Sequence, residues 1–146
     1  MQVDAAHVRD LISTGIVIPS SQELSAALAK RLSGFPLKRT GGIIDWNQIL
    51  GVMVLDWMLH DDAQTLAWAR LTTAGSHKLA VLLYNGDEPC IVGDFADVMR
   101  NLDTLIWTAP GARILFGADG EVDTPQVSDD VIEFNGVDLL FGTRRM

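Results

Sequence analysis

The chain has 146 residues, 48% of them apolar, and its 19 acidic and 11 basic side chains give a formal charge of −8. This length predicts one domain over 1–146, and the apolar content excludes wholesale disorder. The charge is unevenly placed, because residues 1–86 are neutral overall while residues 87–146 hold twelve acidic and four basic side chains. An acidic second half disfavours binding to nucleic acid or to an anionic membrane, and it favours a basic protein partner.

The expected compartment follows from the cysteine content and the apolar runs. A single cysteine, Cys90, excludes an internal disulfide and fits a reducing compartment. The first residues lack the basic and apolar segments of a secretory signal. The longest apolar run, at 49–55, is far shorter than the ~20 residues that span a bilayer. These features predict a cytoplasmic protein without membrane association.

The first elements of the chain are predicted to be helical. Residues 4–13 have helical spacing, and residues 16–19 are expected to be extended, since the residue before a proline avoids the helical region. A second helix is expected over 21–33, because leucines recur there at i, i+4 and i+8. Ser20 and Glu23 fit a capping box at the start of this helix.

Three tryptophans, Trp46, Trp57 and Trp68, are each eleven residues apart, which corresponds to three turns of an α-helix. A helix through Trp46 and Trp57 would place both on one apolar face, and a second helix over 61–71 would carry Trp68. The run 52–55 is also compatible with a buried strand, because a short apolar run does not fix its own period. We expect these tryptophans to be core residues, with a ligand-stacking platform as the alternative.

The second half of the chain predicts strands around one short helix that begins after Asp94. The expected strands lie at 79–84, 89–92, 105–107, 113–116, 131–134 and 137–141. Asn135-Gly136, between the last two, is the strongest hairpin signal in the sequence. Helices followed by strands predict an α+β fold, with N-terminal helices packed on a largely antiparallel sheet from the C-terminal half.

The sequence contains no recognisable motif for catalysis or for a cofactor, so we expect no enzymatic activity, no cofactor and no metal. Asp56 and His60 would share one face of a helix and could bind a metal, although a simple structural pair is the better interpretation. Asp119, Glu121 and Asp123 alternate as in a calcium-binding loop, but a threonine stands where that loop needs glycine. The alternative function is a small enzyme or ligand-binding domain that uses the tryptophans and the Asp56/His60 pair.

Carboxylates of the second half form the candidate binding site for a basic protein. Such groups pair with arginine and steer association between oppositely charged proteins. The candidates expected in loops or beside turns are Asp87, Glu88, Asp119, Glu121, Asp123, Asp129 and Asp130.

In size, acidity and absence of an active-site motif, the chain resembles the immunity proteins of bacterial toxin systems, including those of contact-dependent growth inhibition. The resemblance implies a protein that binds and blocks a toxin domain, most often a nuclease. The active site of a nuclease is basic because its substrate is RNA or DNA. Other acidic binding proteins, such as secretion chaperones or phage inhibitors, fit these features almost as well.

Overall fold

A computed structural model describes residues 6–36, 44–49, 51–83, 90–107, 114–134 and 138–143. The α-helices in these ranges are α1 (Ala6–Ser13), α2 (Gln22–Arg31), α3 (Asp62–Arg70), α4 (Phe95–Arg100) and α5 (Leu102–Trp107). Short 3-10 helices are η1 (Leu32–Gly34), η2 (Trp46–Gln48), η3 (Trp57–Leu59) and η4 (Ala74–Ser76). The strands are β1 (Val17–Pro19), β2 (Met53–Asp56), β3 (Leu79–Leu83), β4 (Ile91–Asp94), β5 (Ile114–Glu121), β6 (Thr124–Phe134) and β7 (Asp138–Thr143).

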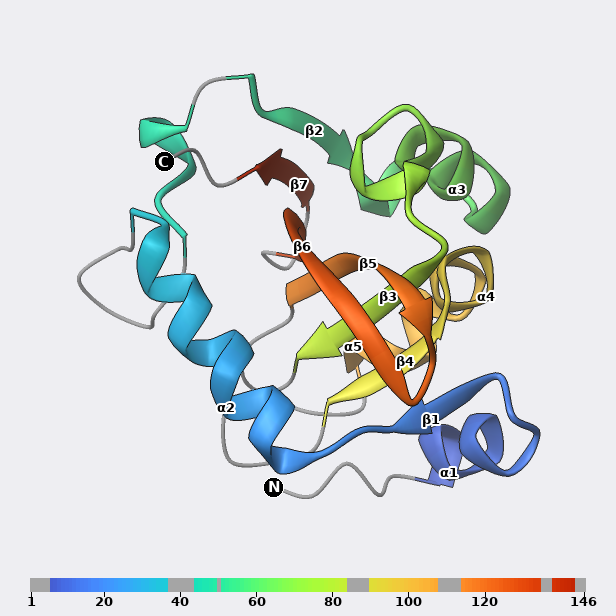
Figure 1. Ribbon diagram of the computed structural model, residues 1–146. Coiled ribbons are helices and arrows are strands. Elements are labelled where there is room, and N and C mark those ends of the chain that lie inside the picture. The colour runs from blue at the N-terminus through green and yellow to red at the C-terminus, as the bar shows by residue number, and fades with distance from the viewer. Residues whose placement is uncertain are drawn as a thin grey trace.

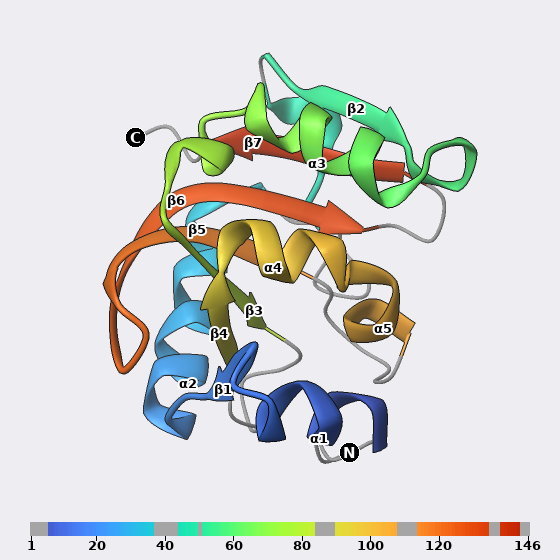
Figure 2. The ribbon, with the colours of Figure 1, turned by 90° about the vertical axis from the view of Figure 1, so that its right-hand side faces the viewer.

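The seven strands form one antiparallel sheet in the order β1-β4-β3-β5-β6-β7-β2. Helices cover both faces of this sheet: α2 lies on one face, and α1, α3, α4 and α5 lie on the other (Figures 1 and 2). The predicted α+β class is therefore confirmed. The two edge strands, β1 and β2, come from the N-terminal half, and two of the helices come from the C-terminal half.

The core consists of two apolar clusters, one on each face of the sheet. Alternate residues of β3 belong to opposite clusters, since Ala80 and Leu82 face α4 and α5 while Val81 and Leu83 face α2. A strand covered on both faces is expected to be apolar at every position rather than at every second one. This explains the continuous run of β3, which is buried throughout.

Helix starts agree closely with the capping signals in the sequence. The side chain of Ser21, one residue later than predicted, accepts a hydrogen bond from the backbone N–H of Leu24 and caps α2. Asp61 and Gln64 form a reciprocal capping box at the start of α3. The longest described helix, α2, has ten residues, and no helix in the described ranges is long and apolar enough to cross a membrane.

The prediction of one helix through Trp46 and Trp57 is wrong. The alternative of a strand is confirmed by β2, but β2 is an edge strand with Val54 exposed rather than a buried strand. Gly51 has a φ of 73°, a left-handed conformation that does not continue a helix and that glycine adopts without a Cβ clash. Beyond it, β2 pairs with β7 along its whole length. The tryptophans still contact the core, but Trp46 packs against one cluster and Trp57 and Trp68 against the other.

In the second half, the predicted β6–β7 pairing is confirmed, although Asn135-Gly136 lies outside the described residues. The strand expected at 105–107 is wrong, because these residues belong to α5. Leu102 and Leu105, three positions apart on that helix, are both buried in the α4/α5 cluster. Packing of this apolar helix face has overridden the strand preference of a short β-branched and aromatic run.

Candidate functional site

The β5–β6 hairpin extends beyond both of its neighbours in the sheet. β5 pairs with β3 only as far as Ala118, and β7 pairs with β6 only from Asp130 onward. Between these points, residues 119–121 and 124–126 pair only with each other among the described strands. Residues 119–129 are called the hairpin extension below, and its projecting end is visible in Figures 1 and 2. A two-stranded ribbon is only marginally stable alone, so other contacts must hold it.

His77, which follows η4, holds the base of the hairpin extension. Its Nδ1 donates to Asp119 Oδ2 at 2.7 Å, and its Nε2 donates to Asp130 Oδ2 at 2.8 Å. Thr73 Oγ1 donates to the second oxygen of Asp130 at 2.8 Å. A Cβ on Gly117 would lie 2.7 Å from the Cδ2 atom of His77, so glycine is needed there for the imidazole ring to approach the strand.

The electrostatics of this contact favour a charged imidazole. Both ring nitrogens must carry a proton to donate to two carboxylates, which is the imidazolium state. Burial by itself lowers the pKa of His77, but hydrogen bonds and charges from Asp130 and Asp119 outweigh that effect and raise it. The pKa of Asp119 is lowered, mainly by its hydrogen bond with His77. The three side chains therefore form an ion-paired bridge between η4 and both strands of the hairpin.

Arg31, the last residue of α2, holds the same hairpin from the other face of the sheet. Its guanidinium donates to Asp129 Oδ1 at 2.7 Å and to the main-chain oxygen of Val127 at 3.0 Å. Between these acceptors, Ser128 Oγ donates to the main-chain oxygen of Gly117 at 2.7 Å. This bond spans the position where the β5–β6 register shifts. The hairpin extension is thus tied to elements on both sides of the sheet.

The end of the hairpin extension is polar and exposed. Glu121, Val122 and Asp123 are all exposed, and Val122 has 39% of its surface accessible. In the described ranges, no hydrogen bond or ion pair involves the side chain of Glu121 or Asp123. We refer to residues 121–123 as the hairpin tip. It presents two carboxylates around one apolar side chain.

The predicted binding residues thus fall into three groups. Asp87 and Glu88 lie outside the described residues, Asp119, Asp129 and Asp130 are held by internal contacts, and Glu121 and Asp123 are exposed at the hairpin tip. The three paired aspartates lie in β5 and β6 rather than in loops: Asp119 is exposed, as expected, whereas Asp129 and Asp130 are partly buried. His77 and Arg31, which sequence reasoning did not select, determine this division. Their partners are 42 to 98 residues away in the chain, and no local pattern indicates them.

The alternative site at Asp56 and His60 is not built as the sequence suggested. Asp56 ends β2, His60 follows η3, and the ring Nδ1 of His60 lies 2.7 Å from the main-chain oxygen of Asp56 rather than from its carboxylate. Within the described ranges, no three His, Cys, Asp or Glu side chains are placed to hold a metal ion. Cys90 is fully buried, and burial raises the pKa of its thiol, so its environment does not favour the reactive thiolate.

Comparison with known proteins adds no family. No family model matches the chain, and no curated protein or solved structure matches it either.

Proposed function

We propose that this protein binds a basic protein through the hairpin tip. The observation that carries the proposal is the shape and charge of the β5–β6 hairpin. Its base is tied to α2 and η4, while Glu121, Val122 and Asp123 remain exposed at its projecting end. A rigid element of this kind loses little conformational entropy on binding. Its carboxylates can pair with arginine or lysine, and Val122 supplies an apolar contact between them.

The more specific proposal is that the partner is the nuclease domain of a toxin from a bacterial competition system and that this protein blocks it without catalysing a reaction. The net charge of −8 supports this proposal, because it attracts a protein whose active site is built for a polyanion. The short length of the hairpin tip also fits insertion into a concave basic site.

The proposal is tested with the protein encoded directly upstream, where the gene of a toxin is expected. Its C-terminal domain is purified, and its affinity for this protein is measured at low and high salt. We expect a stable complex that suppresses nuclease activity and weakens as salt rises, since charge steering is screened over about 8 Å at physiological ionic strength. The double variant Glu121→Gln/Asp123→Asn should slow association by on the order of tenfold at low salt.

The matched control is Glu23→Gln/Asp103→Asn, which removes the same charge from two exposed carboxylates on α2 and α5. This control should associate almost as fast as the wild type. Equal rates for both double variants would show that overall charge, rather than the hairpin tip, directs binding. Failure of the upstream domain to bind at any salt concentration would refute the toxin proposal.

A further inference from the structure

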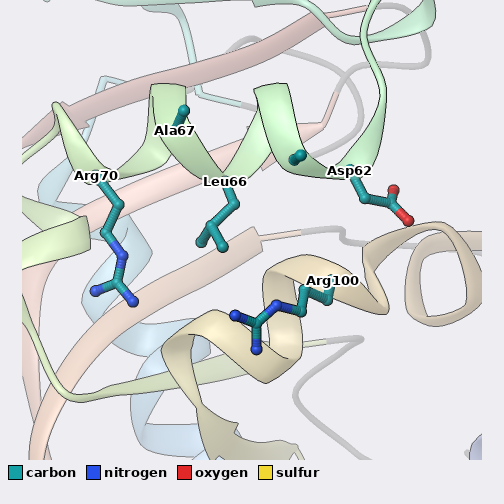
Figure 3. Close-up of a pocket in the computed structure, with 6 residues that line it drawn as sticks. Asp62, Leu66, Ala67, Arg70 and Arg100 are labelled. Carbon is teal, nitrogen blue, oxygen red and sulfur yellow. The ribbon is translucent and has the colours of Figure 1, made fainter.

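A groove of about 620 Å³ lies between α3 and α4, on the face of the sheet opposite α2. Small-molecule sites commonly have volumes of about 300–1,000 Å³, so this groove is of ordinary size for a ligand. It is lined by Asp62, Ala63, Leu66, Ala67, Arg70 and Arg100 (Figure 3). None of these residues belongs to the hairpin extension.

The middle of the groove is apolar. Leu66 extends from α3 toward α4 and packs against the core cluster beneath it (Figure 3). Ala63 and Ala67 flank it on the same helix with side chains too short to fill the space. The apolar part of a ligand can therefore lie along α3, which removes both that part and Leu66 from contact with water.

Two guanidinium groups line the groove, one from each helix. Figure 3 shows Arg70 extending from α3 and Arg100 lying along α4, with the side chain of Leu66 between their two heads in this view. The Cζ atom of Arg70 lies 5.9 Å from the centre of the Phe95 ring, and its Nη1 is 3.4 Å from the main-chain oxygen of Gly75. These contacts orient the head of Arg70 but leave most of its N–H donors available.

Arg100 is similarly available. Its Nη1 lies 3.4 Å from Asp97 Oδ1, a long contact between groups that are 60% and 45% exposed. Such surface pairs contribute little energy and are easily exchanged for a better partner. An arginine fork matches a carboxylate or a phosphate group, each of which accepts several hydrogen bonds at once.

Asp62, the first residue of α3, lies at the opposite end of the groove from Arg70, with the head of Arg100 between them in the view of Figure 3. Its carboxylate would repel a second negative charge at the far end of a bound molecule. The groove is therefore suited to a molecule with one anionic end.

We propose that the α3–α4 groove binds a small organic monoanion whose carboxylate or phosphate head contacts Arg70 and Arg100 and whose apolar tail lies along Leu66. The site is independent of the hairpin tip and of any protein partner.

The test uses octanoate and octyl phosphate as separate probes, which distinguish a carboxylate from a phosphate head. Binding is followed by amide chemical shifts of the full chain. We expect saturable binding of at least one probe, with the largest shifts in α3 and α4. Octylamine and the dianion suberate should each bind about tenfold more weakly or worse. Binding of octanol or octylamine as tight as that of the anions would refute the proposal, as would unsaturated titrations for both anionic probes.

Variants locate the head group. Arg100→Gln removes an exposed charge and should weaken the better probe by about tenfold without changing the melting temperature. Arg70→Gln should weaken it at least as much. Lys30→Gln, which removes an exposed charge from α2 on the other side of the sheet, is the control and should leave affinity unchanged. Equal affinity for Arg100→Gln and Lys30→Gln would overturn the assignment of the arginines.

Discussion

The two halves of β6 are held in place by different forces. Residues 131–134 are buried, and all but Glu133, which accepts a hydrogen bond from Trp46 Nε1 at 2.7 Å, belong to the apolar clusters. The ring of Phe134 meets the ring of Trp57 edge-on at 4.9 Å and 78°. Residues 124–130 are exposed or partly exposed and depend on His77, Thr73 and Arg31. One strand thus passes from a region stabilised by apolar burial into one stabilised by hydrogen bonds and charge. The comparison teaches that carboxylates only a few residues apart can have different roles: Asp129 and Asp130 stabilise the hairpin through internal contacts, whereas Asp123 is exposed at its tip.

The largest effect is expected from damage to the apolar half. Trp57→Ala removes a side chain that is only 9% exposed, together with its contact to Phe134. Loss of a buried aromatic residue costs about 3–5 kcal/mol, a large part of the ~5–15 kcal/mol that stabilises a domain. We expect the variant to be insoluble or to unfold at much lower urea concentration. A variant of normal stability would show that the tryptophan does not support the core.

A smaller effect is expected in the polar half. His77→Ala leaves Asp130, whose side chain is only 15% exposed, without its imidazole partner. Asp130 keeps its hydrogen bond from Thr73, so the cost is that of one lost hydrogen bond to a charged group, about 1.5–3 kcal/mol. We expect a lower free energy of unfolding in urea and faster amide exchange in the hairpin extension, with little change in residues 131–134. The control is His60→Ala at an exposed histidine, which should change stability by less than about 0.5 kcal/mol. Equal losses in the two variants would contradict the role given to His77.

The polar half should also depend on pH. Because the pKa of His77 is raised in the fold, its stabilisation is complete below its ordinary pKa near 6.5 and is lost as pH rises through the folded value. Because the pKa of Asp119 is lowered, its contribution is present above its ordinary value and is lost as pH falls through the folded value. The bridge should therefore be strongest in mildly acidic solution.

Amide exchange in the hairpin extension, measured from pH 5 to pH 9 and corrected for intrinsic rates, tests this dependence. Protection should fall with rising pH in the wild type. It should vary much less in His77→Gln, because glutamine can donate a hydrogen bond but does not titrate. A wild-type profile as flat as that of His77→Gln would show that the imidazole charge does not stabilise the hairpin.

The smallest effect on stability is expected at the hairpin tip. Glu121→Gln/Asp123→Asn should change the free energy of unfolding by no more than about 0.5 kcal/mol, since exposed charges contribute little. The same variant is expected to slow partner binding, so it should lose binding without losing stability. A loss comparable to that of His77→Ala would indicate that the tip carboxylates support the fold.

Much of the apolar architecture could be predicted from sequence, because its signals are local. The continuous apolar run of β3, the capping residues of α3 and the Asn-Gly dipeptide before β7 each indicate their element within a few residues. The eleven-residue spacing of Trp46 and Trp57 was misleading because it matches a helix by coincidence. The intervening Gly51 and the pairing of β2 with β7 break that period.

The polar half of β6 could not be predicted in this way. Residues 124–130 lack apolar alternation. The side chains that hold them as a strand, Arg31 and His77, come from distant parts of the chain. The same applies to the α3–α4 groove, where Arg70 and Arg100 line one groove only because α3 and α4 pack together. Sequence could identify the acidic region, but it could not distinguish the carboxylates held by internal contacts from those of the hairpin tip.

The origin of the two edge strands has a consequence for how the molecule forms during synthesis. Val17 pairs with Gly93 and Met53 pairs with Phe141, so each edge strand pairs with a strand that is synthesised much later. Strands β3 to β7 occupy neighbouring positions in the sheet and follow one another in the chain, so they can pair before β1 and β2 are added. The slow, long-range pairing steps then come last. On the ribosome, we expect β1 to stay unpaired until β4 has emerged, and β2 to stay unpaired until β7 has emerged.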